Sequence, residues 1–151
     1  MSDQLSLQVS GTRAIDSLSA NEFAVEIDGE RASGIFKVTG LVSFKLDIRT
    51  TTSLKEIKEP FKIVKMVQRD SNLPFNRWLR ETQAAKADIV RPTRTIAVIA
   101  IDDGVETRRW TASNAWISEV AYSEFNTGSG ELIEETLTIQ WESIEESWAA
   151  G

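Results

Sequence analysis

The chain has 151 residues, of which 41% are apolar, and it carries a formal net charge of -6 with an isoelectric point near 4.8. A chain of this length can bury one hydrophobic core. We therefore expect a single domain over residues 1–151, with residues 1–20 and 142–151 as extended or flexible ends. The absence of cysteine excludes disulfides and thiolate zinc sites. The acidic balance opposes nucleic-acid binding, which depends on a basic surface.

The first residues of the chain do not have the pattern of a secretory signal. Met1 to Ser10 includes Asp3 instead of a basic run, and no apolar stretch follows it. No segment of the sequence reaches the length of a membrane span. We therefore expect synthesis in the cytoplasm without a signal peptide, and no membrane anchoring.

The first half of the chain predicts an antiparallel meander. Residues 23–27 and 36–38 alternate apolar and polar side chains, and a glycine turn follows each. From Leu41 onward the alternation predicts a strand with one dry side. Its apolar positions are Val42, Phe44, Leu46 and Ile48, and its polar positions are Ser43, Lys45, Asp47 and Arg49.

A polar stretch then separates this strand from the next. Residues 50–59 are typical of a long loop or the tip of a hairpin, and Pro60 begins a β-rich segment at 61–69. Lys62 and Lys65 fall on opposite faces of that segment. Polar groups must therefore touch both of its sides.

One helix interrupts the β pattern. Residues 70–72 offer N-cap side chains, Pro74 suits the first turn, and the helix should end near Asp88. Its apolar face consists of Phe75, Trp78, Leu79 and Thr82.

Strands resume after the helix. Residues 96–101 are apolar on both faces and therefore central, and Asp103-Gly104 turns into a strand at 105–111 that places Arg108 and Arg109 on opposite sides. Two further strands are predicted at 115–125 and 132–141, joined by a glycine-containing loop. The last strand directs Ile133, Leu137, Ile139 and Trp141 inward. The order of elements predicts a mainly β protein, an antiparallel β-barrel or sandwich with one short α-helix at one end or edge.

The sequence offers no coherent catalytic or metal-binding set. It has no histidine, and the adjacent acidic pairs 102–103, 134–135 and 145–146 would point to opposite faces of a strand, so we expect them to be solvated. No calcium loop is present, and Gly128-Ser129-Gly130 lacks the lysine of a phosphate loop. We expect neither an enzyme nor a bound cofactor.

The five tryptophans could line a ligand site, but most have a simpler interpretation. Trp78 and Trp141 occupy core positions of the helix and the last strand. Trp110 and Trp116 are candidate interface aromatics, since exposed tryptophans favour protein contacts. Trp148 could pack back or contact a neighbour. One helix covers only one side of a sheet, so the remaining polar faces and sheet edges suit a subunit made for neighbours.

Three stretches of the chain resemble the tail tube proteins of contractile phages and extracellular contractile injection systems. The segments 21–29 and 34–41 are similar to that family's opening hairpin, and 60–78 to its strand, charged turn and tryptophan-containing helix. Residues 114–116, 125–126, 131–137 and 141–142 are similar to its closing strands. The chain departs from the family's pattern at 57–60 and at Ile117. The departures suggest a specialised ring, for example one near the baseplate.

This resemblance implies a structural subunit that forms homo-hexameric rings stacked into an inner tube. Its partners would be further copies of itself, the contractile sheath, baseplate and cap proteins, and the cargo in the lumen of a phage-tail-like particle. The candidate lumen face is Ser43, Lys45, Asp47 and Arg49, with plain outer surface as the alternative. The candidate ring-stacking loop comprises Thr50, Thr51, Thr52, Ser53, Leu54, Lys55, Glu56, Ile57, Lys58 and Glu59.

Two other interpretations stay open from the sequence. A monomeric β-barrel could bind a small ligand between tryptophans. The related haemolysin-coregulated protein of type VI secretion shares the implied architecture but is less similar at the closing strands.

Overall fold

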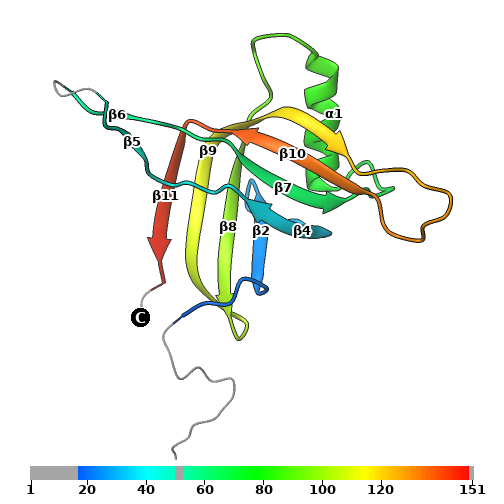
Figure 1. Cartoon of the computed structure of the whole chain (residues 1–151), viewed down its shortest axis with the longest axis horizontal. Helices are drawn as coiled ribbons and strands as arrows, with labels where there is room; N and C mark the ends of the chain where they lie inside the picture. Colours follow the sequence, from blue (N-terminus) through cyan, green and yellow to red (C-terminus); the bar gives the residue numbers. More distant parts are fainter. Residues whose placement is uncertain (1–16, 50–52, 150–151) are drawn as a thin grey trace, which may run out of the picture.

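The computed structural model describes residues 17–49 and 53–149, and it shows a mainly β, antiparallel architecture with one helix, as predicted (Figure 1). The helix α1 spans Pro74–Ala85. The strands are β2 (Phe23–Ile27), β3 (Glu30–Arg31), β4 (Ile35–Thr39), β5 (Leu46–Asp47), β6 (Lys55–Glu56), β7 (Phe61–Met66), β8 (Arg94–Asp102), β9 (Val105–Tyr122), β10 (Glu134–Gln140) and β11 (Ser143–Trp148). Within the described ranges, no helical segment has the length and hydropathy of a membrane span.

The sheet forms two layers that share the long strand β9. The first part of β9 pairs with β8 on one side and β11 on the other, while its second part pairs with β10. The full strand order is β3-β2-β8-β9-β10-β7-β4. Figure 1 shows the first layer running along one direction and the second layer crossing it.

A bulge in the middle of β9 allows this strand to serve both layers. We predicted two strands, at 105–111 and 115–125, and this was wrong: a single strand of 18 residues runs from Val105 to Tyr122. The register to β8 shifts between Arg94 and Ile96, and Asn114 on β9 adopts a φ of 51°. An extra residue with positive φ bends a strand without ending it.

The core lies between the layers and includes the predicted positions Trp78, Leu137, Ile139 and Trp141, whereas Ile133, also predicted to face inward, lies in the loop before β10. The core contains Ile96 and Ala112 from the first layer, Ile63 and Leu137 from the second, and Trp78 from α1. The indole Nε1 of Trp78 donates a hydrogen bond of 2.9 Å to the carbonyl of Pro92. Strand β8 is buried on both faces and lies between β2 and β9, as its uniform apolar pattern predicted.

A buried ion pair ties the helix to the second layer. Lys65, only 1% exposed, donates to Glu135 on β10 at 2.7 Å, to Oδ1 of Asn76 on α1 at 3.2 Å and to the carbonyl of Met66 at 3.0 Å. This arrangement explains how a lysine can occupy an apolar strand. The prediction that Glu135 is solvated was wrong, because this carboxylate neutralises the buried ammonium group. Burial and the hydrogen bond to Glu135 raise the pKa of Tyr122.

The segment after Leu41 differs most from the prediction. We expected a strand over 41–48 with one dry side, but only Leu46–Asp47 is a strand, and Phe44 and Ile48 are 68% and 82% exposed. Among the described residues its only strand partner is β6, while Leu41 packs against the core and Ser43 bonds to Glu146. The predicted hairpin is present and projects from the body of the protein (Figure 1).

The C-terminal end is part of the first layer. We expected residues 142–151 to be extended or flexible, and within the described part Ser143–Trp148 forms β11, paired along its length with β9. Residues 1–16 of the predicted N-terminal end lie outside the described residues.

Candidate assembly surfaces

The first candidate surface is a projecting hairpin, which we call the arm and define as the described residues 43–49 and 53–59. Strands β5 and β6 pair within it, and the backbone N–H of Ile57 donates to the carbonyl of Lys45 at 2.8 Å. Lys45 also forms an ion pair of 2.6 Å with Glu59. The candidate stacking residues Ser53–Glu59 therefore form one side of a hairpin, while Thr50, Thr51 and Thr52 lie outside the described residues.

The four candidate lumen residues do not share one face of a sheet. Asp47 forms an ion pair of 3.0 Å with Arg49, which lowers the pKa of Asp47 chiefly through the side-chain hydrogen bond. Ser43 donates a hydrogen bond to Glu146 on β11, and Lys45 pairs within the arm. The sheet face from which we inferred a lumen wall is absent here, and the lumen assignment stays a prediction.

At the root of the arm, one arginine lies between two tryptophan rings. The guanidinium carbon of Arg108 is 3.8 Å from the ring centroid of Trp148 and 5.1 Å from that of Trp110. Its Nη2 donates to Glu146 at 2.5 Å. The hydrogen bond from Ser43, followed by the contact with Arg108, lowers the pKa of Glu146. This cluster joins the arm, β9 and β11. The exposed ring of Trp148 forms the solvent-facing side of this cluster.

The neighbouring arginine points to the other side of β9, as predicted. Arg109 pairs with Glu26 on β2 at 2.8 Å and with Glu106 at 2.9 Å. These contacts raise the pKa of Arg109, and the hydrogen bond from Arg109 lowers the pKa of Glu106. Arg108 and Arg109 therefore form ion pairs on opposite faces of the first layer.

Trp116, the second candidate interface aromatic, lines an open pocket of about 660 Å³ between the bend of β9 and the loop after α1. Asn114 and Glu142 form one wall and are hydrogen-bonded to each other. Ile89 lies on the opposite wall and is almost fully exposed. Trp110 and Trp116 are both half-buried, and their part in an interface stays a prediction.

The second layer ends in two strand edges. Among the described residues, β4 pairs only with β7, and the second part of β9 pairs only with β10, since its pairing with β8 stops at Ala115. Unpaired edges carry free N–H and C=O groups that can pair with another chain. They are therefore candidate contacts between copies.

Among residues 17–49 and 53–149, no group of three or more carboxylate side chains is close enough to hold a metal ion. The features that distinguish this protein are edges, a projecting arm and exposed aromatic rings, which suit contacts with other proteins.

Comparison with known proteins agrees with this description. The sequence profile of the T4-like virus tail tube protein gp19 family matches residues 19–145, which is most of the chain. The chain belongs to this family. The match starts before β2 and ends within β11, so it includes both layers, the arm and α1. No curated protein shows significant sequence similarity to the chain.

Solved structures share the fold at low sequence identity. The anti-feeding prophage cap, described as the AFP tube terminating cap, has a TM-score of 0.71 and 16% identity, covering 97% of each chain. The PVC sheath-tube complex in its extended state has a TM-score of 0.70 and 14% identity, covering 95% of this chain and 100% of that one. Hcp1 from Flavobacterium johnsoniae has a TM-score of 0.56 and 12% identity, covering 85% and 96%.

Two features of the surface were not predicted from the sequence. The Arg108–Trp148 contact depends on the pairing of β11 with β9, which places residues 40 positions apart in register. The connecting loop was predicted at 126–130 only, with Phe125 and Leu132 in the flanking strands; in the structure the loop extends over 123–133 and presents both side chains to solvent. The signal available in the sequence was the presence of two large apolar side chains, Phe125 and Leu132, on either side of the glycine-containing loop.

Proposed function

We propose that this protein is the subunit of the inner tube of a contractile injection system or phage tail, in which six copies close into a ring and the rings stack into a hollow rod inside a sheath. The observation that carries the proposal is the pair of unpaired edges on one sheet, in a member of a tail tube family. The number six rests on the family resemblance.

The two edges explain how a ring would form. If β4 of one copy pairs with residues 117–122 of the next copy, the same contact repeats around an axis. Such a head-to-tail contact closes into a ring when the rotation between copies divides a full turn. Closure would pair every edge of the second layer, which removes the risk of uncontrolled aggregation.

In this proposal the function is mechanical. The sheath contracts, the rigid tube is driven through a target envelope, and cargo passes along the lumen. The subunit contributes a packed core and ordered contacts between copies, and it carries out no catalysis and needs no cofactor. The comparison with a sheath-tube complex supports a sheath as partner.

Electron microscopy of the purified protein, with its mass in solution, tests the proposal. We expect six-fold rings or hollow rods and a mass of six times 16.9 kDa for the ring. A strict monomer at high concentration would contradict the proposal and favour the ligand-binding barrel.

Deletion of Ser53 to Lys58 should leave rings but abolish rods, because it removes one side of the arm.

A specialised ring at one end of the tube is a second candidate, supported by the comparison with a tube terminating cap. The same experiment separates the two candidates. A tube subunit should form rods of variable length, whereas a specialised ring should stop at single or paired rings at every concentration.

A further inference from the structure

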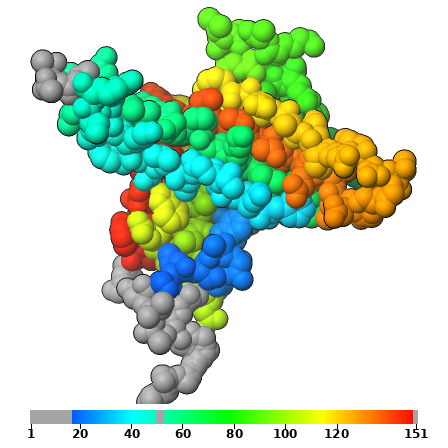
Figure 2. Space-filling view, in the orientation of Figure 1, coloured from blue at the N-terminus to red at the C-terminus, as the bar shows by residue number. Residues whose placement is uncertain are grey.

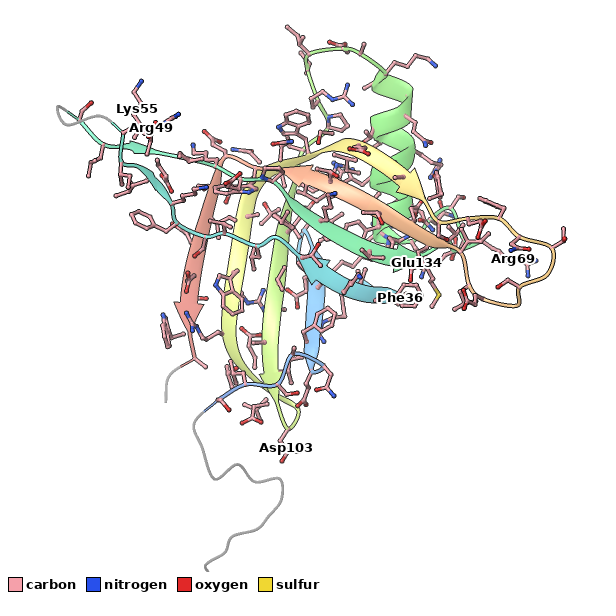
Figure 3. All side chains as sticks on the ribbon, viewed as in Figure 1. Phe36, Arg49, Lys55, Arg69, Asp103 and Glu134 are labelled. Carbon is pink, nitrogen blue, oxygen red and sulfur yellow. The ribbon has the colours of Figure 1, made fainter. Side chains whose placement is uncertain are left out.

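Two projections lie at opposite ends of the longest axis of the molecule. Figures 1 and 2 show the arm at one end and the loop between β9 and β10 at the other. We call residues 123–133 the acidic loop. Figure 3 shows the same separation, with Arg49 and Lys55 at one end and, toward the other, Glu134, which follows the acidic loop, and Arg69 beside it. The two projections of one chain therefore cannot contact each other.

The arm combines exposed apolar side chains with an excess of basic ones. Phe44 and Ile48 are largely exposed, and Leu54 is 61% exposed. Lys45 and Arg49 are neutralised within the arm by Glu59 and Asp47. Lys55 and Lys58 are exposed and have no ion-pair partner among the described residues. The arm thus has three unused apolar side chains and two unused lysines, against the single carboxylate of Glu56.

The acidic loop has the complementary composition. Phe125 is 73% exposed and Leu132 is 63% exposed, and each is next to a glutamate, Glu124 and Glu131. Residues 123–133 contain no lysine or arginine.

Internal hydrogen bonds hold the acidic loop in shape. The carbonyl of Asn126 accepts from the N–H of Ser129 at 3.1 Å, and its side chain accepts from the N–H of Gly128 at 2.8 Å. The N–H of Val67 donates to the carbonyl of Ile133 at 3.1 Å. A partner binding to an ordered loop loses less conformational entropy than one binding to a flexible loop.

We propose that the acidic loop receives the arm of a second copy of this chain, located in the next ring of the tube. The inference rests on the proposed function and identifies the surface on which the arm docks. The apolar side chains of the arm pack beside Phe125 and Leu132, while Lys55 and Lys58 face Glu124 and Glu131. Because donor and acceptor are different surfaces of one chain, the contact is head-to-tail, and it produces an open stack when successive copies are displaced along the tube axis.

The lack of native cysteine allows a direct test by cross-linking. A disulfide forms only when the two Cα atoms approach within about 7 Å. We expect the Leu54→Cys/Phe125→Cys double variant to give a ladder of linked subunits on mild oxidation, visible on a non-reducing gel. A mixture of the two single variants should give dimers. The Leu54→Cys/Ile89→Cys variant is the control, because Ile89, 93% exposed against 73% for Phe125, is accessible on a different loop, and it should give no ladder.

Charge reversal tests the electrostatic half of the contact. Glu124→Lys/Glu131→Lys should raise the concentration for half-maximal stacking by about tenfold or more, since every contact around a ring is weakened together. Adding Lys55→Glu/Lys58→Glu should restore stacking to within about threefold of the wild type. Glu145→Lys, on β11, should leave stacking unchanged.

The outcomes separate this inference from the proposed function. Rods that form without the Leu54–Phe125 cross-link, or a ladder from the Ile89 control, would overturn the docking site and leave the tube assignment intact. Rings without rods after charge reversal, rescued by the second reversal, would support the docking site. Absence of rings and rods from the wild-type protein at every concentration would overturn both.

Discussion

Two of the ion pairs that join distant parts of the chain lie in opposite environments. Lys65 and Glu135 are buried between β7, β10 and α1, with side chains 1% and 5% exposed. Arg108 and Glu146 lie at the root of the arm, and their side chains are about one third exposed. Each pair links two strands at a distance of 2.7 Å or less.

The difference lies in what each charge loses when its partner is removed. Water can solvate an exposed charge that loses its partner, so the loss is small. A buried charge has no such replacement, and its solvation penalty must be met by the protein. Lys65 accordingly has three hydrogen-bond acceptors, whereas Arg108 relies on one carboxylate and two aromatic rings. We therefore expect the buried pair to be required for folding, and the exposed pair to make only a small contribution to the free energy of unfolding.

The largest expected effect comes from breaking the buried pair. Lys65→Met leaves Glu135 without a counter-charge, and we expect the free energy of unfolding to fall by about 3–5 kcal/mol. Denaturant titration measures the change. Lys62→Met is the matched control, since this lysine is exposed on the same strand, and it should change stability by less than about 0.5 kcal/mol.

Removing both charges sharpens the interpretation. Lys65→Met/Glu135→Leu removes the buried charge altogether, so it should recover most of the stability lost in the single variant. A double variant no more stable than Lys65→Met would show that the pair has a role in packing, independent of charge.

A smaller effect is expected at the exposed pair. Trp148→Ala removes the closer of the two rings that contact Arg108, and we expect a loss of about 0.5–1 kcal/mol, measured by the same titration. Trp148→Phe should retain part of this contribution, because a smaller ring still offers a π face. A loss above about 3 kcal/mol from Trp148→Ala would contradict the distinction between the two regions.

How much of this could be predicted depends on the range of the interactions. The apolar spacing of Phe75, Trp78 and Leu79 predicted α1, because a helix buries a face defined by neighbours in sequence. Its end was placed three residues too late, at Asp88. The helix stops when Lys86 adopts a φ of 49° and its N–H donates to Gln83 at 3.2 Å. The side chains around this turn do not predict that the helix ends there.

The alternation of apolar and polar residues gave wrong predictions where the partner strand was missing or irregularly paired. Residues 42–48 alternate as a buried strand does, but within the described residues only Leu46–Asp47 pairs with another strand, and Phe44 and Ile48 remain exposed. In β4 we expected Phe36 to share a face with Val38, yet a register shift between Ile35 and Lys37 brings Ile35 to the core and leaves Phe36 exposed. Periodicity shows that a segment can be a strand, whereas its register depends on partners far away in the sequence.

Sequence reasoning identified Lys65 as unusual, because a lysine on each face of an apolar strand requires polar neighbours on both sides. It did not identify Glu135 as the partner, since 70 positions separate the two residues. The candidate interface residues Trp110 and Trp116 were selected for residue type alone. Their different surroundings, one beside Arg108 and the other on a pocket, follow from the bend of β9 at Asn114.

The smallest expected effect is a pH dependence confined to the exposed pair. The hydrogen bond from Ser43 and the contact with Arg108 lower the pKa of Glu146 below its ordinary value of 4.5. A carboxylate with a lowered pKa in the folded state stabilises the protein above the unfolded-state pKa, and this stabilisation is lost as the pH falls through the folded-state pKa. Glu146→Gln should therefore have a slightly lower Tm than the wild type at pH 7, with the difference shrinking as the pH falls below 4.5. Other carboxylates titrate equally in both proteins and cancel in the difference. A difference in Tm that stays constant down to pH 3 would show that Glu146 acts through packing instead of charge, and the exposed pair would then contribute no electrostatic stabilisation.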